Sequence, residues 1–323
     1  MAVYTHVSAE MMARFLDDYD TGELISFKGI AEGVENSNFL VETRGGMDGH
    51  RFILTLYEKR VDPQDLPFFM ALLDHLAERG CRVPRAIADR GGVQIRELAG
   101  RPACLIEFLE GISLTAPSPA QAHAAGEALA KMHHAVADFG GARANSMGLA
   151  SWHDLAGRCA GQWQQIDPAL EGLVESELAF LSSHWPHDLP QSVIHADLFP
   201  DNVLMLGDRV SGLIDFYFSC RDARAYDLAV THSAWCFSPD GRSFDSAVSE
   251  ALLQGYHANL RLNPEEIQAL PILARGSALR FTLSRAYDWI NTPPDALVTR
   301  KDPMAFARRL TFYADPAHAG LFG

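Results

Sequence analysis

The stretch Val193-Ile194-His195-Ala196-Asp197-Leu198-Phe199-Pro200-Asp201-Asn202-Val203-Leu204-Met205 decides which fold this chain adopts. It begins with an apolar run typical of a β-strand, passes through a short polar loop and returns to a second apolar run. The dipeptide Gly207-Asp208 predicts a tight turn, and a third apolar run ends directly before Asp215. We expect this strand–loop–strand–turn–strand unit to bring Asp197, Asn202 and Asp215 together at one end of a small hairpin.

These three side chains are the types that phosphoryl transfer requires. One carboxylate can orient an attacking hydroxyl and accept its proton, while further oxygen ligands hold Mg²⁺ against a triphosphate. Asp and Asn also favour turns, so the loop conformation explains any one of these residues equally well. It is the ordered string of all three that predicts a phosphotransferase site.

Composition narrows the class of protein. The chain has 323 residues, 48% of them hydrophobic and 21% charged, which is typical of a soluble globular protein. Its net charge of -14 argues against nucleic acid or an anionic membrane as the main partner, because both favour basic patches. No apolar run approaches the roughly 18 residues of a membrane span, and no signal peptide is visible. The five cysteines lack metal or redox spacing, so we expect a cytoplasmic protein.

The order of the expected elements indicates an α+β protein. Strands are expected over 24–27, 37–43, 51–57, 93–98 and 103–109, and helices over 8–20 and 63–79. The glycine-rich turn at 45–49 makes the first three strands an antiparallel meander. Later helices are expected over 119–137, 151–163, 168–184, 226–236, 243–259, 264–291 and 303–313. Strands followed by helices predict two lobes, residues 1–110 and 111–323.

The motif His195-Ala196-Asp197, followed by Asn202 and then by Ile214-Asp215-Phe216, resembles the catalytic segments of the aminoglycoside phosphotransferase/choline kinase superfamily. The resemblance implies a bilobal protein-kinase-like fold, with an antiparallel N-lobe sheet carrying a helix and a mainly helical C-lobe with a small catalytic hairpin. It implies ATP and Mg²⁺ as cofactors and a small-molecule substrate. It also implies that Asp197 is the catalytic base, that Asn202 and Asp215 bind Mg²⁺, and that His195 supports the loop.

The same resemblance predicts where ATP binds. The backbone around Glu107, Phe108 and Leu109 is expected to hold adenine, and the first lobe is expected to be the nucleotide-binding lobe. The remaining residues expected around ATP are Gly33, Asn36, Ser37 and Thr55. Glycines and small polar residues in a loop can direct backbone N–H groups at phosphate.

The match to the superfamily departs from its usual pattern on the third strand. Thr55 stands where relatives carry a lysine that contacts the phosphates, and the following helix offers no glutamate to pair with it. Both members of the ion pair are therefore absent together, which avoids burying one charge alone. Lys28 and Lys59 are candidates for the missing cation, although ordinary surface positions explain both.

Among the superfamily's members, the chain most resembles its homoserine kinases. The similarity rests on the blocks at 3–8, 33–39 and 52–60 and on Lys301-Asp302-Pro303. It implies phosphorylation of the side-chain hydroxyl of L-homoserine. Candidate substrate contacts are Tyr217, Trp235, Arg280 and Arg285. A buried ion-pair network explains the two arginines equally well, and core packing explains the two aromatics.

Other activities remain open at this point. A choline, ethanolamine, sugar or aminoglycoside kinase of the same superfamily is the first alternative, because an acidic protein suits cationic acceptors. The missing lysine motivates a second alternative, a degenerate nucleotide-binding pseudokinase, which the complete set of Asp197, Asn202 and Asp215 opposes. A zinc hydrolase is disfavoured because the sequence has no H-E-x-x-H motif.

Overall fold

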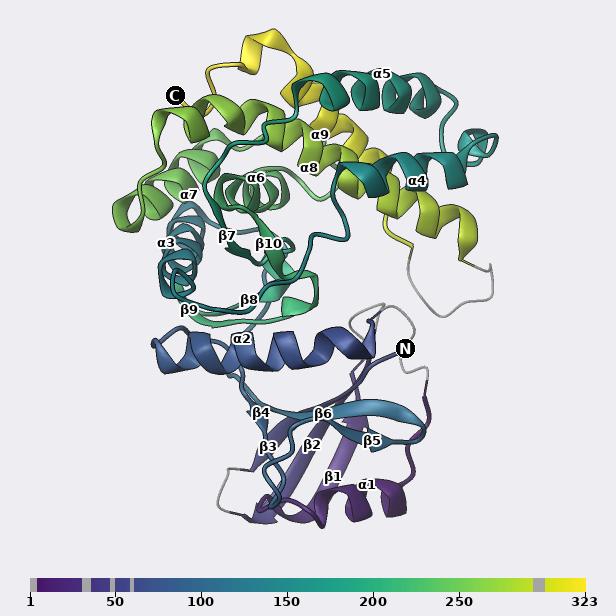
Figure 1. Cartoon of the computed structure of the whole chain (residues 1–323), viewed down its shortest axis with the longest axis vertical. Helices are drawn as coiled ribbons and strands as arrows, with labels where there is room; N and C mark the ends of the chain where they lie inside the picture. Colours follow the sequence, from purple (N-terminus) through teal and green to yellow (C-terminus); the bar gives the residue numbers. More distant parts are fainter. Residues whose placement is uncertain (1–4, 31–35, 47–49, 59–60, 293–299) are drawn as a thin grey trace. The chain divides into compact units, whose positions relative to one another are not determined.

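The computed structural model describes residues 5–30, 36–46, 50–58, 61–292 and 300–323. The chain divides into two compact units, Met1–Glu110 and Gly111–Gly323 (Figure 1). The division falls at the residue where the sequence places the boundary between its two lobes. The nucleotide-binding and catalytic roles assigned to those lobes stay predictions.

The first unit is built on one antiparallel sheet. Its strands are β1 Gly22–Gly29, β2 Ser37–Gly45, β3 Arg51–Leu56, β4 Ala86–Ile87, β5 Arg96–Leu98 and β6 Arg101–Glu107. They lie in the order β1-β2-β3-β6-β4, with β5 paired to β6, and every pair is antiparallel. The predicted meander of the first three strands is confirmed.

Helix α1, Ala9–Leu16, covers part of this sheet. Ser8 caps it, because its side chain accepts a hydrogen bond from the backbone N–H of Met11. Met12, Phe15 and Leu16 share one buried cluster with Phe39, Val41, Phe52 and Leu54 of β2 and β3. Figure 1 shows α1 beside the strands, and α2, Leu66–Glu78, elsewhere in the same unit. The helix over 63–79 was the one expected to pack on the sheet. Helix α1 packs on the sheet as well, because one side of α1 is apolar.

The second unit is mainly helical. Its helices are α3 Pro119–Ala135, α4 Leu149–Cys159, α5 Ala169–His184, α6 Arg224–Trp235, α7 Ser246–Asn259, α8 Pro264–Asn291 and α9 Met304–Ala314. Figure 1 shows α6 in the middle of this unit, and every residue from Ala225 to Trp235 is buried. Asn263 and Glu266 form a capping box that starts α8 at the predicted residue.

The strand-rich island forms two ribbons instead of one continuous unit. β8, Val203–Leu206, and β9, Arg209–Leu213, make the predicted hairpin. β7, Gln191–Ile194, pairs instead with β10, Cys220–Ala223. Sequence reasoning missed β10 because four residues that include Arg221 and Asp222 carry little strand pattern. The loop between β7 and β8 therefore lies between two separate pairings.

Candidate active site

The loop between β7 and β8 brings Asp197 and Asn202 into contact. The side-chain amide Nδ2 of Asn202 donates to the backbone oxygen of Asp197 at 2.8 Å and to its carboxylate Oδ2 at 3.2 Å. A 3-10 turn at Pro200–Asn202 makes this return possible, because it shortens the path back towards Asp197. The predicted juxtaposition of these two side chains is present in the structure.

Asp215 joins them through the backbone. The N–H of Ile214 donates to the backbone oxygen of Asn202 at 3.0 Å, so the segment that ends β9 lies directly beside the loop. Asp215 has φ 64° and ψ 60°, in the left-handed region, and its side chain is exposed. The three residues of the predicted set therefore lie on adjoining backbone segments of one unit.

His195 connects the same two segments. Its ring Nε2 lies 3.0 Å from the backbone oxygen of Ile214, and its Nδ1 accepts the N–H of Asp197 at 3.3 Å. These partners require a neutral ring protonated at Nε2. Burial lowers the pKa of His195, and the nearby charge of Asp227 opposes that shift only in part. The geometry matches the supporting role expected for His195, because the ring contacts backbone on both sides.

A buried carboxylate holds the start of the loop. Asp227 of α6 accepts the N–H groups of His195 and Ala196, each at 2.7 Å, and contacts Nε2 of His133 at 2.9 Å. Burial by itself raises the pKa of Asp227, but its hydrogen bonds with the His133 ring and the His195 N–H, and the two nearby imidazoles, outweigh that effect and lower it. A fully buried charge of this kind is tolerated because each oxygen has a strong donor.

Two residues expected to line the substrate pocket contact the loop backbone instead. Trp235 is buried, and its indole Nε1 donates to the backbone oxygen of Leu198 at 2.9 Å. Arg280 is only 1% exposed, and its Nη1 donates to the backbone oxygen of Ala196 at 2.6 Å. The sequence signal for this arrangement was the apolar character of α8, because a buried arginine needs carbonyl or carboxylate acceptors.

Arg285 is placed differently from Arg280, five residues earlier on the same helix. It is half-buried, its guanidinium lies 4.4 Å from the ring of Phe306, and Nη1 donates to the backbone oxygen of Asp302 at 3.3 Å. Burial lowers the pKa of Arg285 to about 10, Arg309 adds to the shift, and the charge of Asp197 opposes it. The charges of Asp201 and Asp302 oppose the shift as well, so three carboxylates favour the protonated form of Arg285.

Tyr217 lies two residues after Asp215. It lies in the 3-10 turn Phe216–Phe218 and is half-buried. Its position beside Asp215 is compatible with the substrate contact that the sequence predicts.

The candidate nucleotide residues at the start of β2 and on β3 pair with neighbouring side chains of the first unit. Ser37 Oγ donates to Glu58 Oε1 at 2.7 Å, and the N–H of Glu58 donates to Asn36 Oδ1 at 3.4 Å. Thr55 is buried, and its hydroxyl donates to Asn38 Oδ1 at 2.8 Å. A threonine fits this site on β3 because its small side chain is satisfied by one neighbouring amide. Gly33 and Lys59 lie outside the described residues, and Lys28 is exposed on β1.

The expected adenine segment begins where β6 ends. The backbone N–H of Glu107 donates to the oxygen of Arg85 at 2.9 Å, and its carboxylate accepts the N–H of Arg85 at 3.0 Å. The guanidinium of Arg51 lies 4.5 Å from the ring of Phe108. Phe108 and Leu109 are half-buried. The two hydrogen bonds between Glu107 and Arg85 hold this segment beside Arg85 and set the direction in which the backbone leaves the sheet.

The donor atoms of the second unit suit a hard divalent cation. Nδ2 of Asn202 is directed at Asp197, which leaves the amide oxygen of Asn202 for another partner. An amide oxygen and a carboxylate are ligands that Mg²⁺ prefers, and Mg²⁺ completes its shell with water and phosphate. Within the described ranges no three His, Cys, Asp or Glu side chains gather as a metal cage. An amide oxygen and a carboxylate therefore fit a cation that is held jointly with a phosphate.

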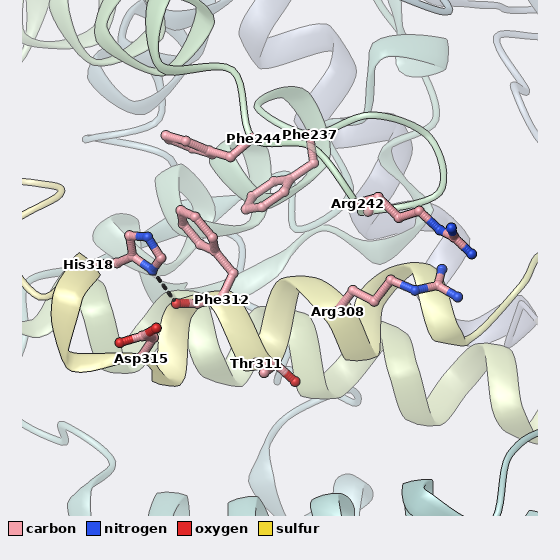
Figure 2. Close-up of a pocket in the computed structure, with 9 residues that line it drawn as sticks. Phe237, Arg242, Phe244, Arg308, Thr311, Phe312, Asp315 and His318 are labelled. Atoms are coloured by element: carbon pink, nitrogen blue, oxygen red, sulfur yellow. Dashed lines mark hydrogen bonds between the residues drawn. The ribbon is translucent and has the colours of Figure 1, made fainter.

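A hollow of about 450 Å³ lies away from these residues, between the segment after α6 and helix α9 (Figure 2). Phe237, Phe244 and Phe312 form its apolar part, and Figure 2 shows Arg242 and Arg308 at one side. Both arginines already contact Asp240, one through its carboxylate and the other through its backbone oxygen. None of the predicted site residues lines this hollow. This hollow therefore does not mark the predicted active site.

The fold belongs to the class of small-molecule kinases. A solved amicoumacin kinase, in complex with AMP-PNP and Ca²⁺, superimposes with a TM-score of 0.70 at 14% identity, over 95% of this chain and 94% of that one. The chain belongs to the phosphotransferase enzyme family, whose model matches residues 26–269.

Two relatives match nearly the whole chain. The homoserine kinase of Zymomonas mobilis is 54% identical over 317 residues, covering 98% of each chain. The homoserine kinase of Methylobacterium radiotolerans is 51% identical over 323 residues, covering 100% of this chain and 99% of its own. The predicted family is confirmed.

Among the described helices, none is both long and apolar enough to cross a membrane.

Proposed function

We propose that this protein is a homoserine kinase. It transfers the γ-phosphoryl group of ATP to the side-chain hydroxyl of L-homoserine, giving O-phospho-L-homoserine and ADP, a step towards threonine in the cytoplasm. The observation that carries the proposal is the contact of Asp197 with Asn202, beside the segment that ends at Asp215, in a chain 54% identical to a homoserine kinase.

Asp197 acts as the base in this proposal. Its carboxylate, oriented by the amide of Asn202, accepts the proton of the substrate hydroxyl as the oxygen attacks phosphorus. Asn202 contributes its amide oxygen, and Asp215 its carboxylate, as ligands for Mg²⁺. These two residues would hold Mg²⁺, which would supply positive charge to the phosphates. His195 and Asp227 keep the loop backbone in place and do not exchange protons with the substrate.

ATP binds to the first unit in this proposal. The backbone of Glu107, Phe108 and Leu109 meets the adenine, and Thr55 lies on the phosphate side. Asn36 and Ser37 would contact the phosphates, and Gly33, which lies outside the described residues, is proposed to do so as well. Because Thr55 carries no charge, Mg²⁺ and backbone N–H groups take a larger share of phosphate neutralisation than in relatives with a lysine there.

The substrate carboxylate binds Arg285. The guanidinium stacks on Phe306 and donates one hydrogen bond to a backbone oxygen, and within the described part of the chain no carboxylate lies at ion-pair distance from it. A partly desolvated arginine with spare donors suits a planar carboxylate. The opposing effect of the Asp197 charge on the pKa of Arg285 supports a site in which the substrate's charged end lies near the base. Tyr217 is proposed as a further substrate contact.

The proposal is tested by measuring Mg²⁺-dependent ADP release with L-homoserine, choline, ethanolamine, methylthioribose and kanamycin as separate acceptors. We expect L-homoserine alone to stimulate release strongly. Stimulation by another acceptor only would keep the phosphotransferase mechanism and reject the proposed substrate. No stimulation by any acceptor, with ATP still bound, would reject the kinase activity in favour of a nucleotide-binding pseudokinase.

A further inference from the structure

Arg280 is one of the largest fully buried side chains in the protein, and its charge lacks a conventional partner. No carboxylate lies within ion-pair distance of it in the ranges that the structure describes, and its Nε is buried without an acceptor. Its compensation comes from the backbone oxygen of Ala196 and from the faces of two rings, Phe281 at 4.7 Å and Phe218 at 5.3 Å. An apolar side chain of similar volume would avoid this cost to stability.

The backbone that Arg280 contacts is in an uncommon conformation. Ala196 has φ 62°, in the left-handed region, which is unfavourable for a non-glycine residue. Such a residue persists only where its surroundings determine its conformation. At Ala196 the N–H is held by the Asp227 carboxylate and the C=O by the Arg280 guanidinium. Opposite charges therefore fix the two peptide groups on either side of this residue.

The second of those peptide groups belongs to Asp197. The C=O of Ala196 and the N–H of Asp197 form one planar unit, so the hydrogen bond from Arg280 sets the plane from which the Asp197 side chain projects. The same guanidinium contacts Phe218, three residues after Asp215, in the turn that follows it. Asp215 is also left-handed, at φ 64°. One side chain of α8 thus contacts both strained turns of the candidate active site.

We propose that Arg280 is a positioning residue, which directs the Asp197 carboxylate towards the substrate hydroxyl and couples the catalytic loop to the turn after Asp215. The inference rests on the proposed function, because it takes Asp197 as the base. It assigns Arg280 a role different from contact with the substrate. Its effect on the reaction passes through backbone geometry, so it should alter turnover more than substrate binding.

The test compares Arg280→Met, Arg280→Lys and Arg275→Met in steady-state kinetics and thermal unfolding. Arg275 is the matched control: it lies on the same helix, is largely buried and makes a two-point ion pair with Glu177 at 2.7 and 2.9 Å, without contacting the loop. We expect Arg280→Met to lower kcat about 100-fold, with KM for ATP and for homoserine within about threefold and any fall in Tm no larger than that of Arg275→Met. We expect Arg275→Met to lower Tm and leave kcat unchanged.

Arg280→Lys keeps one donor and the charge, so it should recover about tenfold of the lost kcat. If Arg280→Met does not fold, the lysine variant decides alone, with kcat about tenfold below wild type at unchanged KM. Wild-type kcat in every Arg280 variant that folds would overturn the inference. A tenfold or larger rise in KM for homoserine with kcat intact would also overturn it, by showing substrate contact. The variants are assayed with whichever acceptor stimulates ADP release by the wild type. If homoserine fails and another acceptor works, the proposed substrate is rejected and the role of Arg280 is still tested. If no acceptor stimulates release, both proposals are rejected.

Discussion

The two candidate binding regions of this protein are stabilised in different ways. In the second unit, the loop around Asp197 is held by buried charges, with Asp227 on its N–H groups and Arg280 on a carbonyl. In the first unit, Thr55 is satisfied by a neutral partner, Asn38. Charged partners hold a strained backbone strongly but respond to pH and to loss of one partner, whereas neutral pairs respond little to either. The catalytic region is therefore the more precise and the more fragile of the two.

The largest expected effect breaks the catalytic side of this comparison. Asp197→Asn should lower kcat by about a thousandfold or more, because general-base catalysis contributes roughly 10²–10⁴ and the amide cannot accept the proton. ATP affinity should stay within about threefold, since the metal ligands are unchanged. Steady-state kinetics and nucleotide titration check both values.

Asp201→Asn is the control for that variant. Asp201 is exposed, and its carboxylate Oδ2 lies 3.5 Å from Nζ of Lys301. The kcat of Asp201→Asn should stay within about twofold of wild type. Near-wild-type turnover in Asp197→Asn would assign the base to another residue.

The next effect separates substrate binding from loop geometry. Arg285→Gln should raise KM for homoserine roughly 10–100-fold with a smaller change in kcat, because a charge-assisted hydrogen bond is worth about 1.5–3 kcal/mol. Arg308→Gln is the control, since Arg308 also lies near Asp302, at 3.7 Å, but lines the hollow of Figure 2. An unchanged KM in Arg285→Gln would remove Arg285 from the substrate site.

Acid should destabilise the second unit through its buried histidines. His232 lies between the hydroxyls of Tyr313 and Ser249, and burial lowers the pKa of His232 to about 3. Because the unfolded chain binds the proton near pH 6.5 and the folded one does not, stability falls as pH drops below 6.5 and levels off near 3. Between pH 7 and 5 the loss from His232 is about 2 kcal/mol.

Urea unfolding at both pH values measures this loss. His232→Gln should flatten the pH dependence, whatever its own cost to stability. His153→Gln, at an exposed position on α4, should leave it as in the wild type. Equal slopes in wild type and His232→Gln would contradict the assignment.

The smallest expected effect concerns the neutral pair of the first unit. Thr55→Val should cost about 1 kcal/mol, because it removes the hydrogen bond to Asn38, and should raise KM for ATP only about threefold. A double-mutant cycle with Asn38→Ala should recover a coupling energy of about 0.5–1.5 kcal/mol. No measurable coupling would show that the pair contributes nothing, and a large rise in KM for ATP would give Thr55 a direct contact with phosphate.

The elements that sequence reasoning predicted best were those with a strong local period. The helix over 264–291 was correct at both ends, and its start follows from Asn263 and Glu266, whose capping box depends only on neighbouring residues. The hairpin of β8 and β9 was correct for the same reason, since its turn is local. The pairing of β7 with β10 was missed, because a four-residue strand carries almost no pattern and its partner is distant in sequence.

The sequence by itself determined which side chains can supply the proposed chemistry: Asp197, Asn202 and Asp215 are close along the chain, and short strands with a tight turn place their backbone segments side by side. Only the tertiary structure decided what supports them. Trp235 and Arg280 read as pocket residues in the sequence, yet both are buried and bond to the loop backbone. The type of each side chain can be read from the sequence. The acceptor that a buried donor finds cannot, because it depends on which distant carbonyl the packing of α6 and α8 places beside that donor.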